Sequence, residues 1–186
     1  MTLLELIKKT LALIEELNID SKKYTDDPDI SLKLKYVINQ VLYRVARIKK
    51  IPKYIELQVS AGDLITFEDI ARECGYEVYQ LGSVQGVNFT YKADGTVIKV
   101  LETGTLEIDC YVYPERITDT TPDSYEFEIS QDVFEILPYG IAADLLKSDV
   151  SAEYGSVYAT QFESMLQQVD PRYHTTTVYI EGGVSV

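Results

Sequence analysis

The spacing of apolar residues changes twice along the chain, and this change limits the fold more than any other feature. Apolar side chains recur every three or four residues up to about residue 50 and again after about residue 132, which is the period of an amphipathic helix. Between these regions they alternate with polar residues, which is the period of a strand. The order of parts is therefore two helices, a β insertion and two more helices.

An α+β fold follows from this order. For one helical core, the strands must leave the helices and return to them at the same end. We predict a four-helix bundle-like core formed by residues 1–53 and 130–171, interrupted by an antiparallel β-sandwich or curled sheet at residues 54–129. Residues 172–186 are predicted to form an extended C-terminal arm. With 186 residues and 46% hydrophobic content, the chain can bury a packed core.

The first two helices are predicted over Thr2–Asn18 and about Pro28–Lys50. Asp27 is a good N-cap for the second, and Pro28 suits the first helical position. Cations near the C-terminal end of this helix stabilise its dipole and need no functional explanation. Lys33 and Lys35 lie near the start of the helix, where the dipole does not favour them, so we predict that they contact a partner.

The last two helices are predicted within residues 125–170. Ser130 or Asp132 can cap the first, and Pro138 predicts a break in it. The second carries one apolar stripe with residues three and four apart and ends at Asp170-Pro171. The members of that stripe are Tyr154, Val157, Tyr158, Phe162, Met165, Leu166 and Val169.

About six short strands are predicted between the helices. The Asp94-Gly95 turn between two alternating runs is the strongest hairpin signal in the chain. Residues 67–75 fit a short helix closed by Gly75 and a strand with a turn equally well. The predicted strands are residues 54–59, 77–81, 88–92, 96–101, 105–113 and 125–129.

The net charge of −13 is unevenly spread. Residues 1–53 hold 11 basic and 7 acidic side chains, a net charge of +4, and residues 54–186 hold 6 basic and 23 acidic ones, a net charge of −17. An acidic body repels phosphate, so wholesale nucleic-acid binding is disfavoured. The two-ended charge indicates an assembly in which one end meets a surface of opposite sign. The alternative is that the charged runs are only solvated faces.

No pattern in the chain supports catalysis. The only histidine, His174, has no nucleophile context, and no phosphate-binding glycine motif is present. Cys74 and Cys110 are far apart in sequence and are interpreted as buried reduced thiols. Strand carboxylates alternate with apolar residues, as on a solvated face, and those of residues 26–29 suit a loop and a cap. We therefore predict no enzyme, no catalytic residue, no cofactor and no metal.

The tyrosines and the C-terminal arm indicate partner binding. The chain has 15 tyrosines and no tryptophan, and tyrosine is common at interfaces. Tyr36 and Tyr43 lie off the main helical stripe and are predicted to face a neighbouring subunit. In the arm, a segment of high β-propensity is predicted to bind a partner by strand addition, or else to complete the β-domain of its own chain. This segment consists of Thr175, Thr176, Thr177, Val178, Tyr179 and Ile180.

The whole pattern resembles tailed-phage head-tail connector (adaptor) proteins, including the tail-tubular type with a β-domain. The resemblance covers nearly the full chain: a short helix, the longer helix with INQVLYRVARIKKIP, a β insertion ending in LEIDCYVYPERI, and two further helices. Its most specific part is Ile136-Leu137-Pro138-Tyr139 followed by Ala142-Ala143-Asp144-Leu145-Leu146, which leads into a helix of the form A-x-x-Y-x-x-x-Y-x-x-x-F.

This resemblance implies a ring, commonly of about twelve copies, docked between the portal and the tail in the virion neck. Such a ring continues the DNA channel without sequence-specific binding, and a C-terminal extension often reaches the portal. The protein would be assembled in the host cytoplasm. No membrane span is expected, because no apolar run approaches the required length.

Three alternatives stay open. One is another neck or tail ring, such as a tail terminator. The second is a carbohydrate- or receptor-binding module, and the third is an enzyme with a carboxylate site. The second would use a β face with Tyr79, Tyr91, Tyr111 and Tyr113.

Overall fold

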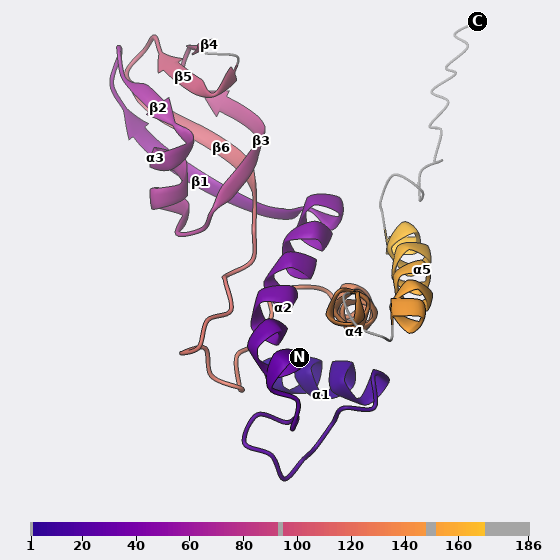
Figure 1. Ribbon diagram of the computed structural model, residues 1–186. Helices are drawn as coiled ribbons and strands as arrows, with labels where there is room; N and C mark the ends of the chain where they lie inside the picture. Colours follow the sequence, from indigo (N-terminus) through magenta and orange to yellow (C-terminus); the bar gives the residue numbers. More distant parts are fainter. Residues whose placement is uncertain (1, 93–94, 148–151, 170–186) are drawn as a thin grey trace, which may run out of the picture.

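The computed structural model describes residues 2–92, 95–147 and 152–169. This part of the chain contains five helices and two three-stranded antiparallel sheets, which confirms the predicted α+β class. Figure 1 shows the strands gathered with one short helix in a β part, which projects from a helical part formed by the other four helices. The predicted arm, residues 172–186, lies outside the described residues.

Each of the first two helices begins directly after a capping residue, and the cap of the second, Asp27, is the predicted one. In α1 (Leu3–Leu13), the side chain of Thr2 accepts from the N–H of Glu5, and the Glu5 carboxylate accepts from the N–H of Thr2. In α2 (Pro28–Lys49), the Asp27 carboxylate accepts the N–H groups of Asp29 and Ile30. Helix α1 ends five residues earlier than predicted.

The third long helix, α4 (Gln131–Leu146), runs through Pro138, so the predicted break is wrong. Proline leaves the carbonyl of Phe134 without its helical donor, which costs about 3 kcal/mol. Burying one large apolar side chain contributes about 1.5–3 kcal/mol. Phe134, Leu137 and Ile141 on either side of the proline are fully buried, so packing outweighs the lost hydrogen bond.

Helix α4 lies at the centre of the helical part and contacts the other three helices. It packs against α1, α2 and the last helix, α5 (Ala152–Val169), and most of its side chains are buried. Figure 1 shows α4 end-on, lying between α2 and α5. The apolar cluster around it takes its residues from α1, α2, α4, α5 and the segment 117–127.

The β part has its own apolar cluster. The first sheet has β6 (Gly104–Val112) between β1 (Ile51–Val59) and β3 (Val78–Gly86). The second has β5 (Val97–Val100) between β2 (Leu64–Thr66) and β4 (Phe89–Lys92), and the β4–β5 pairing confirms the predicted hairpin. The undecided stretch is a helix, α3 (Phe67–Cys74), closed by Gly75 at φ 77°. The apolar cluster is made by Ile55, Val59, Ile70, Ile98, Val100, Leu106, Ile108, Cys110 and Val112.

The predicted strand at residues 125–129 is wrong. Only Glu126 forms a single bridge, and its partner is Thr2 in the helical part. The carbonyls of Tyr125 and Asp123 accept the first N–H groups of α1, from Leu3 (2.9 Å) and Leu4 (3.0 Å). Because those N–H groups have no partner inside the helix, the segment satisfies α1 instead of extending a sheet.

Tyrosines join the two parts. The ring of Tyr113 stacks on that of Tyr43 from α2, with centroids 4.4 Å apart, and lies 4.7 Å from that of Tyr79 in β3. The hydroxyl of Tyr79 donates to the carbonyl of Ala46 (2.8 Å), and Nε of Arg47 donates to the hydroxyl of Tyr113 (2.5 Å). The end of α2 is thus fixed to the first sheet by stacking and by hydrogen bonds.

Candidate subunit interface

Helix α2 exposes two large apolar side chains one turn apart. Leu32 is 76% exposed and Tyr36 is 61% exposed, whereas the buried row of this helix, with Leu34, Ile38 and Val41, faces the core. The hydroxyl of Tyr36 accepts from Nε2 of Gln40 at 2.7 Å, which fixes the ring direction along the helix. Leu32, Lys33 and Tyr36 are called the α2 face below.

Helix α5 exposes a second apolar surface. Tyr154 is 69% exposed and Val157 is 51% exposed; these two residues are called the α5 face. Both residues were predicted to lie in the buried stripe, and the structure corrects this assignment. The buried residues of α5 are Gly155, Phe162 and Leu166. The row that contains Val157 continues through polar Gln161, Ser164 and Gln168. A row that is mostly polar indicates an exposed side of the helix, and this pattern could have corrected the prediction.

A hollow of about 320 Å³ adjoins the α5 face. It is lined by the end of α1, the end of α4 and the start of α5, where Tyr158 donates from its hydroxyl to the carbonyl of Leu13. The lining residues are Leu13, Ile14, Glu15, Leu146, Tyr154 and Tyr158. This hollow is large enough to receive a protruding apolar side chain, such as those of the α2 face.

The two faces lie on different sides of the helical part, and the helices that bear them differ in net charge. Helix α4 separates the helices that bear them (Figure 1). Helix α2 has five basic and one acidic side chain, a net charge of +4, and α5 has two acidic and no basic side chain, a net charge of −2. One molecule cannot bring its own two faces together, but two adjacent copies can.

Only some of the predicted partner-binding residues are exposed and unengaged enough to contact another molecule. Lys33 and Tyr36 are exposed on the α2 face, and Lys33 lies 3.9 Å from Asp29. Lys35 is attached within the chain, because its Nζ donates to the carbonyl of Thr118 (3.1 Å) and lies 3.4 Å from the Asp119 carboxylate.

Tyr43 does not project outward, because its ring stacks on Tyr113. Burial raises the pKa of the Tyr43 hydroxyl, and nearby Glu77 raises it further. Thr175, Thr176, Thr177, Val178, Tyr179 and Ile180 lie outside the described residues, and their predicted role stays a prediction.

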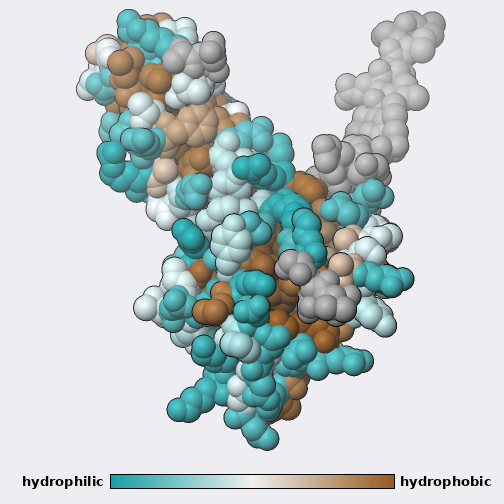
Figure 2. Space-filling model, viewed as in Figure 1, coloured by the Kyte–Doolittle hydropathy of each residue, from teal (hydrophilic) through white to brown (hydrophobic). Residues whose placement is uncertain are grey.

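The tyrosines proposed for a carbohydrate-binding face are not arranged as one platform. Tyr79 and Tyr113 pack against each other at the join of the two parts, and Nζ of Lys50 lies 4.6 Å above the ring of Tyr111. Tyr91 is 49% exposed on the other sheet, in β4. The end of the β part also exposes Leu64 and Leu101, and Figure 2 shows hydrophobic surface there.

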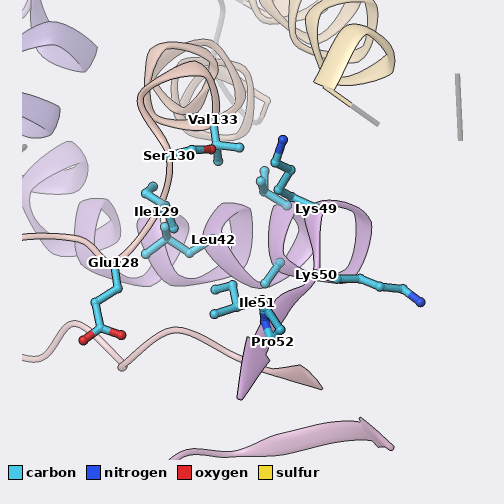
Figure 3. Close-up of a pocket in the computed structure, with 11 residues that line it drawn as sticks. Leu42, Lys49, Lys50, Ile51, Pro52, Glu128, Ile129, Ser130 and Val133 are labelled. Carbon is cyan, nitrogen blue, oxygen red and sulfur yellow. The ribbon is translucent and has the colours of Figure 1, made fainter. Parts of the chain in front are cut away.

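A second hollow, of about 210 Å³, lies where α2 passes into β1 (Figure 3). Its lining is mainly apolar, with Leu42, Val45 and Val133. Two of its charged lining groups are engaged within the chain, Lys49 with Asp132 at 3.3 Å and Glu128 with Lys53 at 3.1 Å. It therefore offers apolar contact but few charged groups that could orient a substrate.

Within the described ranges, no group of three or more histidine, cysteine or acidic side chains is placed to hold a metal ion. His174 falls outside these ranges. None of the described helices combines the length and hydrophobicity that a membrane span requires.

The comparisons with known proteins give no identification. No protein-family model matches this chain, and no curated protein matches it significantly.

Proposed function

We propose that this protein is a structural subunit of a tailed-phage neck, a head-tail connector (adaptor) that forms a ring between portal and tail and continues the DNA channel. The observation that carries the proposal is the pair of unlike apolar faces on α2 and α5. A cyclic ring needs a heterologous interface, in which one patch meets a different patch of the next copy. Leu32 and Tyr36 protrude from α2, and the α5 face borders a hollow of a size that receives such side chains, so the two surfaces are complementary in shape.

The acidic character of the rest of the chain suits the same role. Residues 54–186 carry a net charge of −17, and an acidic lumen repels DNA so that it passes without sequence-specific binding. A ring of about twelve copies, contact with the portal and location in the virion neck are what the family resemblance adds. A tail terminator or other neck ring would use the same kind of interface and would differ in the protein that it touches.

The test combines native mass spectrometry with two double variants. Leu32→Ser with Tyr36→Ser removes the α2 face, and Tyr154→Ser with Val157→Ser removes the α5 face. We expect the unchanged protein to form rings, alone or on portal rings, and each double variant to fail. A mixture of the two variants should form dimers, because each retains the face that the other lacks.

The matched control is Tyr91→Ser with Leu101→Ser, which removes two exposed apolar side chains from the β part and should leave rings intact. Three results would contradict the proposal. They are an unchanged protein that stays monomeric with and without portal rings, a control variant that also fails, and a mixture of the face variants that yields no dimer.

A further inference from the structure

Both cysteines of the chain belong to the apolar cluster of the β part. Cys110, in the central strand β6, is fully buried, and Cys74, at the end of α3, is half-buried and packs against the same cluster. They are far apart in the sequence, and the fold brings their elements together. Helix α3 packs on β1 and β3, the two strands that flank β6 in the first sheet (Figure 1).

The two cysteines lie on facing surfaces of α3 and the first sheet. Cys74 follows Ile70 by one turn, so both lie on the same side of α3, and Ile70 is 1% exposed. Cys110 lies on the buried face of β6, whereas Glu107 and Asp109 on the opposite face are exposed. The buried side of α3 therefore covers the face of the sheet that carries Cys110.

The turn after α3 lies beside Cys110. Lys53 of β1 is directly opposite Cys110 in the antiparallel pairing, so their side chains lie on the same face of the sheet. Nζ of Lys53 lies 4.2 Å from the ring centroid of Tyr76, which is two residues after Cys74. Burial, and after it the neighbouring Cys74 thiol, raises the pKa of the Cys110 thiol to about 12. The two thiols are thus neighbours in the folded chain.

We propose that Cys74 and Cys110 are the site of a reversible intramolecular disulfide, formed when the protein meets a low-molecular-weight disulfide such as oxidised glutathione. The bond links the end of α3 to the central strand of the first sheet. Ile70 is the only fully buried residue of α3, so this helix can shift locally at small cost and let the two sulfurs approach. The inference does not depend on ring formation, because the α2 and α5 faces lie elsewhere.

The exchange uses the two thiols in sequence. Cys74, the more accessible, attacks one sulfur of oxidised glutathione as a thiolate, forms a mixed disulfide and expels one glutathione. The thiolate of Cys110 then attacks Sγ of Cys74, forms the Cys74–Cys110 bond and expels the second glutathione. The two protein thiols lose two electrons, the glutathione disulfide gains them, and the two thiol protons end on the two released glutathione molecules. The second step is the slower one, because the raised pKa of Cys110 keeps its thiolate scarce.

The test is intact-mass spectrometry of the full chain after incubation with oxidised glutathione, followed by alkylation with iodoacetamide in denaturant. We expect a monomer that is lighter than the reduced chain by two hydrogen atoms and carries no alkyl group. Excess dithiothreitol should restore both alkylation sites. The oxidised protein should melt roughly 5–15 °C higher than the reduced one, because the bond restricts the unfolded chain.

Two variants separate the steps. Cys110→Ala should stop at the mixed disulfide, with one glutathione on Cys74, and Cys74→Ala should take up none while folded, because Cys110 is buried. Far-UV circular dichroism checks the fold of each variant, and the result on the unchanged chain decides the proposal even where a variant unfolds. In the unchanged chain, a lasting mixed disulfide, two thiols that can still be alkylated, a disulfide-linked dimer or a lower melting temperature after oxidation would overturn it.

Discussion

Gly140 is the position where one added methyl group should matter most. It lies in α4, and a Cβ there would come within 2.8 and 2.9 Å of two ring carbons of Phe162 in α5 and within 2.9 Å of a methyl group of Val41 in α2. Ordinary contact begins at 3.4 Å, so the nearest ring atom would have to retreat by 0.6 Å. Because the methyl group is held between two helices, it cannot move away from one without approaching the other.

The expected effect of Gly140→Ala is a loss of up to about 2 kcal/mol in the free energy of unfolding, because overpacking costs about 1–3 kcal/mol and the better helix propensity of alanine returns about 1 kcal/mol. For a chain of this size the melting temperature should fall by up to about 8 °C. Urea unfolding followed by far-UV circular dichroism measures the change.

Two further variants isolate the cause. Gly155→Ala is the helical control, because its nearest contacts, Leu146 and Ala143, would lie at 3.3–3.4 Å, so it should not destabilise and should gain up to about 1 kcal/mol from helix propensity. In a Phe162→Leu background the ring is gone, so Gly140→Ala should cost about 1 kcal/mol less than in the unchanged protein. Equal costs in the two backgrounds, or a more stable Gly140→Ala variant, would refute the argument.

Three other predictions follow from the contacts already described. Tyr113→Ala should lower the free energy of unfolding by about 3 kcal/mol because it removes the stacked ring, and Tyr113→Phe should lower it by only about 1 kcal/mol, so equal losses in urea unfolding would contradict the role of stacking. The hydrogen bond from Lys53 lowers the pKa of Glu128 below its ordinary value of 4.5. The pair therefore stabilises the fold above pH 4.5, and this contribution is lost as the pH falls through the lowered pKa. Glu128→Gln should destabilise the protein at about pH 7 and much less at about pH 3. Burial raises the pKa of the Cys110 thiol to about 12, so in the native protein iodoacetamide should alkylate the half-buried Cys74 and leave Cys110 unmodified, which peptide mass mapping would show.

Local features of the sequence predicted the local parts of the fold. The Asp27-Pro28 pair places the start of α2 because a cap and a fixed φ act within one turn of the chain. Alternation between residues 54 and 113 identified five of the six described strands, and β2 (Leu64–Thr66) was missed because it has only three residues. The pattern is clearest in β1 and β6, where alternate residues on one face are buried. Neither feature needs a distant partner.

The predictions were wrong where contacts with residues far along the chain determine the local structure. Residues 125–129 alternate like a strand, but the carbonyl of Tyr125 accepts from the N–H of Leu3 at the start of α1, more than 110 residues earlier. Pro138 should break an isolated helix, yet the apolar side chains on both sides of it are buried. Tyr154 and Val157 fit a helical stripe, but α5 contacts the core through a narrower row.

The candidate surfaces were predictable only in part. Lys33 and Tyr36 are exposed as expected. Tyr43 is half-buried, because its ring stacks on Tyr113. Tyr113 lies 70 residues further along the chain, so local spacing could not identify it as the partner. A hollow of about 500 Å³ is lined by residues of α2 and of the segments after α3 and β6. No spacing in the sequence shows that Glu77 and Glu115 would line the same hollow.

The pairing of Ile51 with Val112 has a consequence for the order in which the chain folds. Every described strand finds its partner within residues 51–112, so this part can fold while later residues are still being synthesised. Once this part has folded, the end of α2 and residue 113 lie side by side, because Ile51 pairs with Val112. The loop that must close to bring α4 onto α2 is then only the segment 113–130. Since the entropy of loop closure grows with loop length, early folding of the strands lowers the barrier to docking of α4.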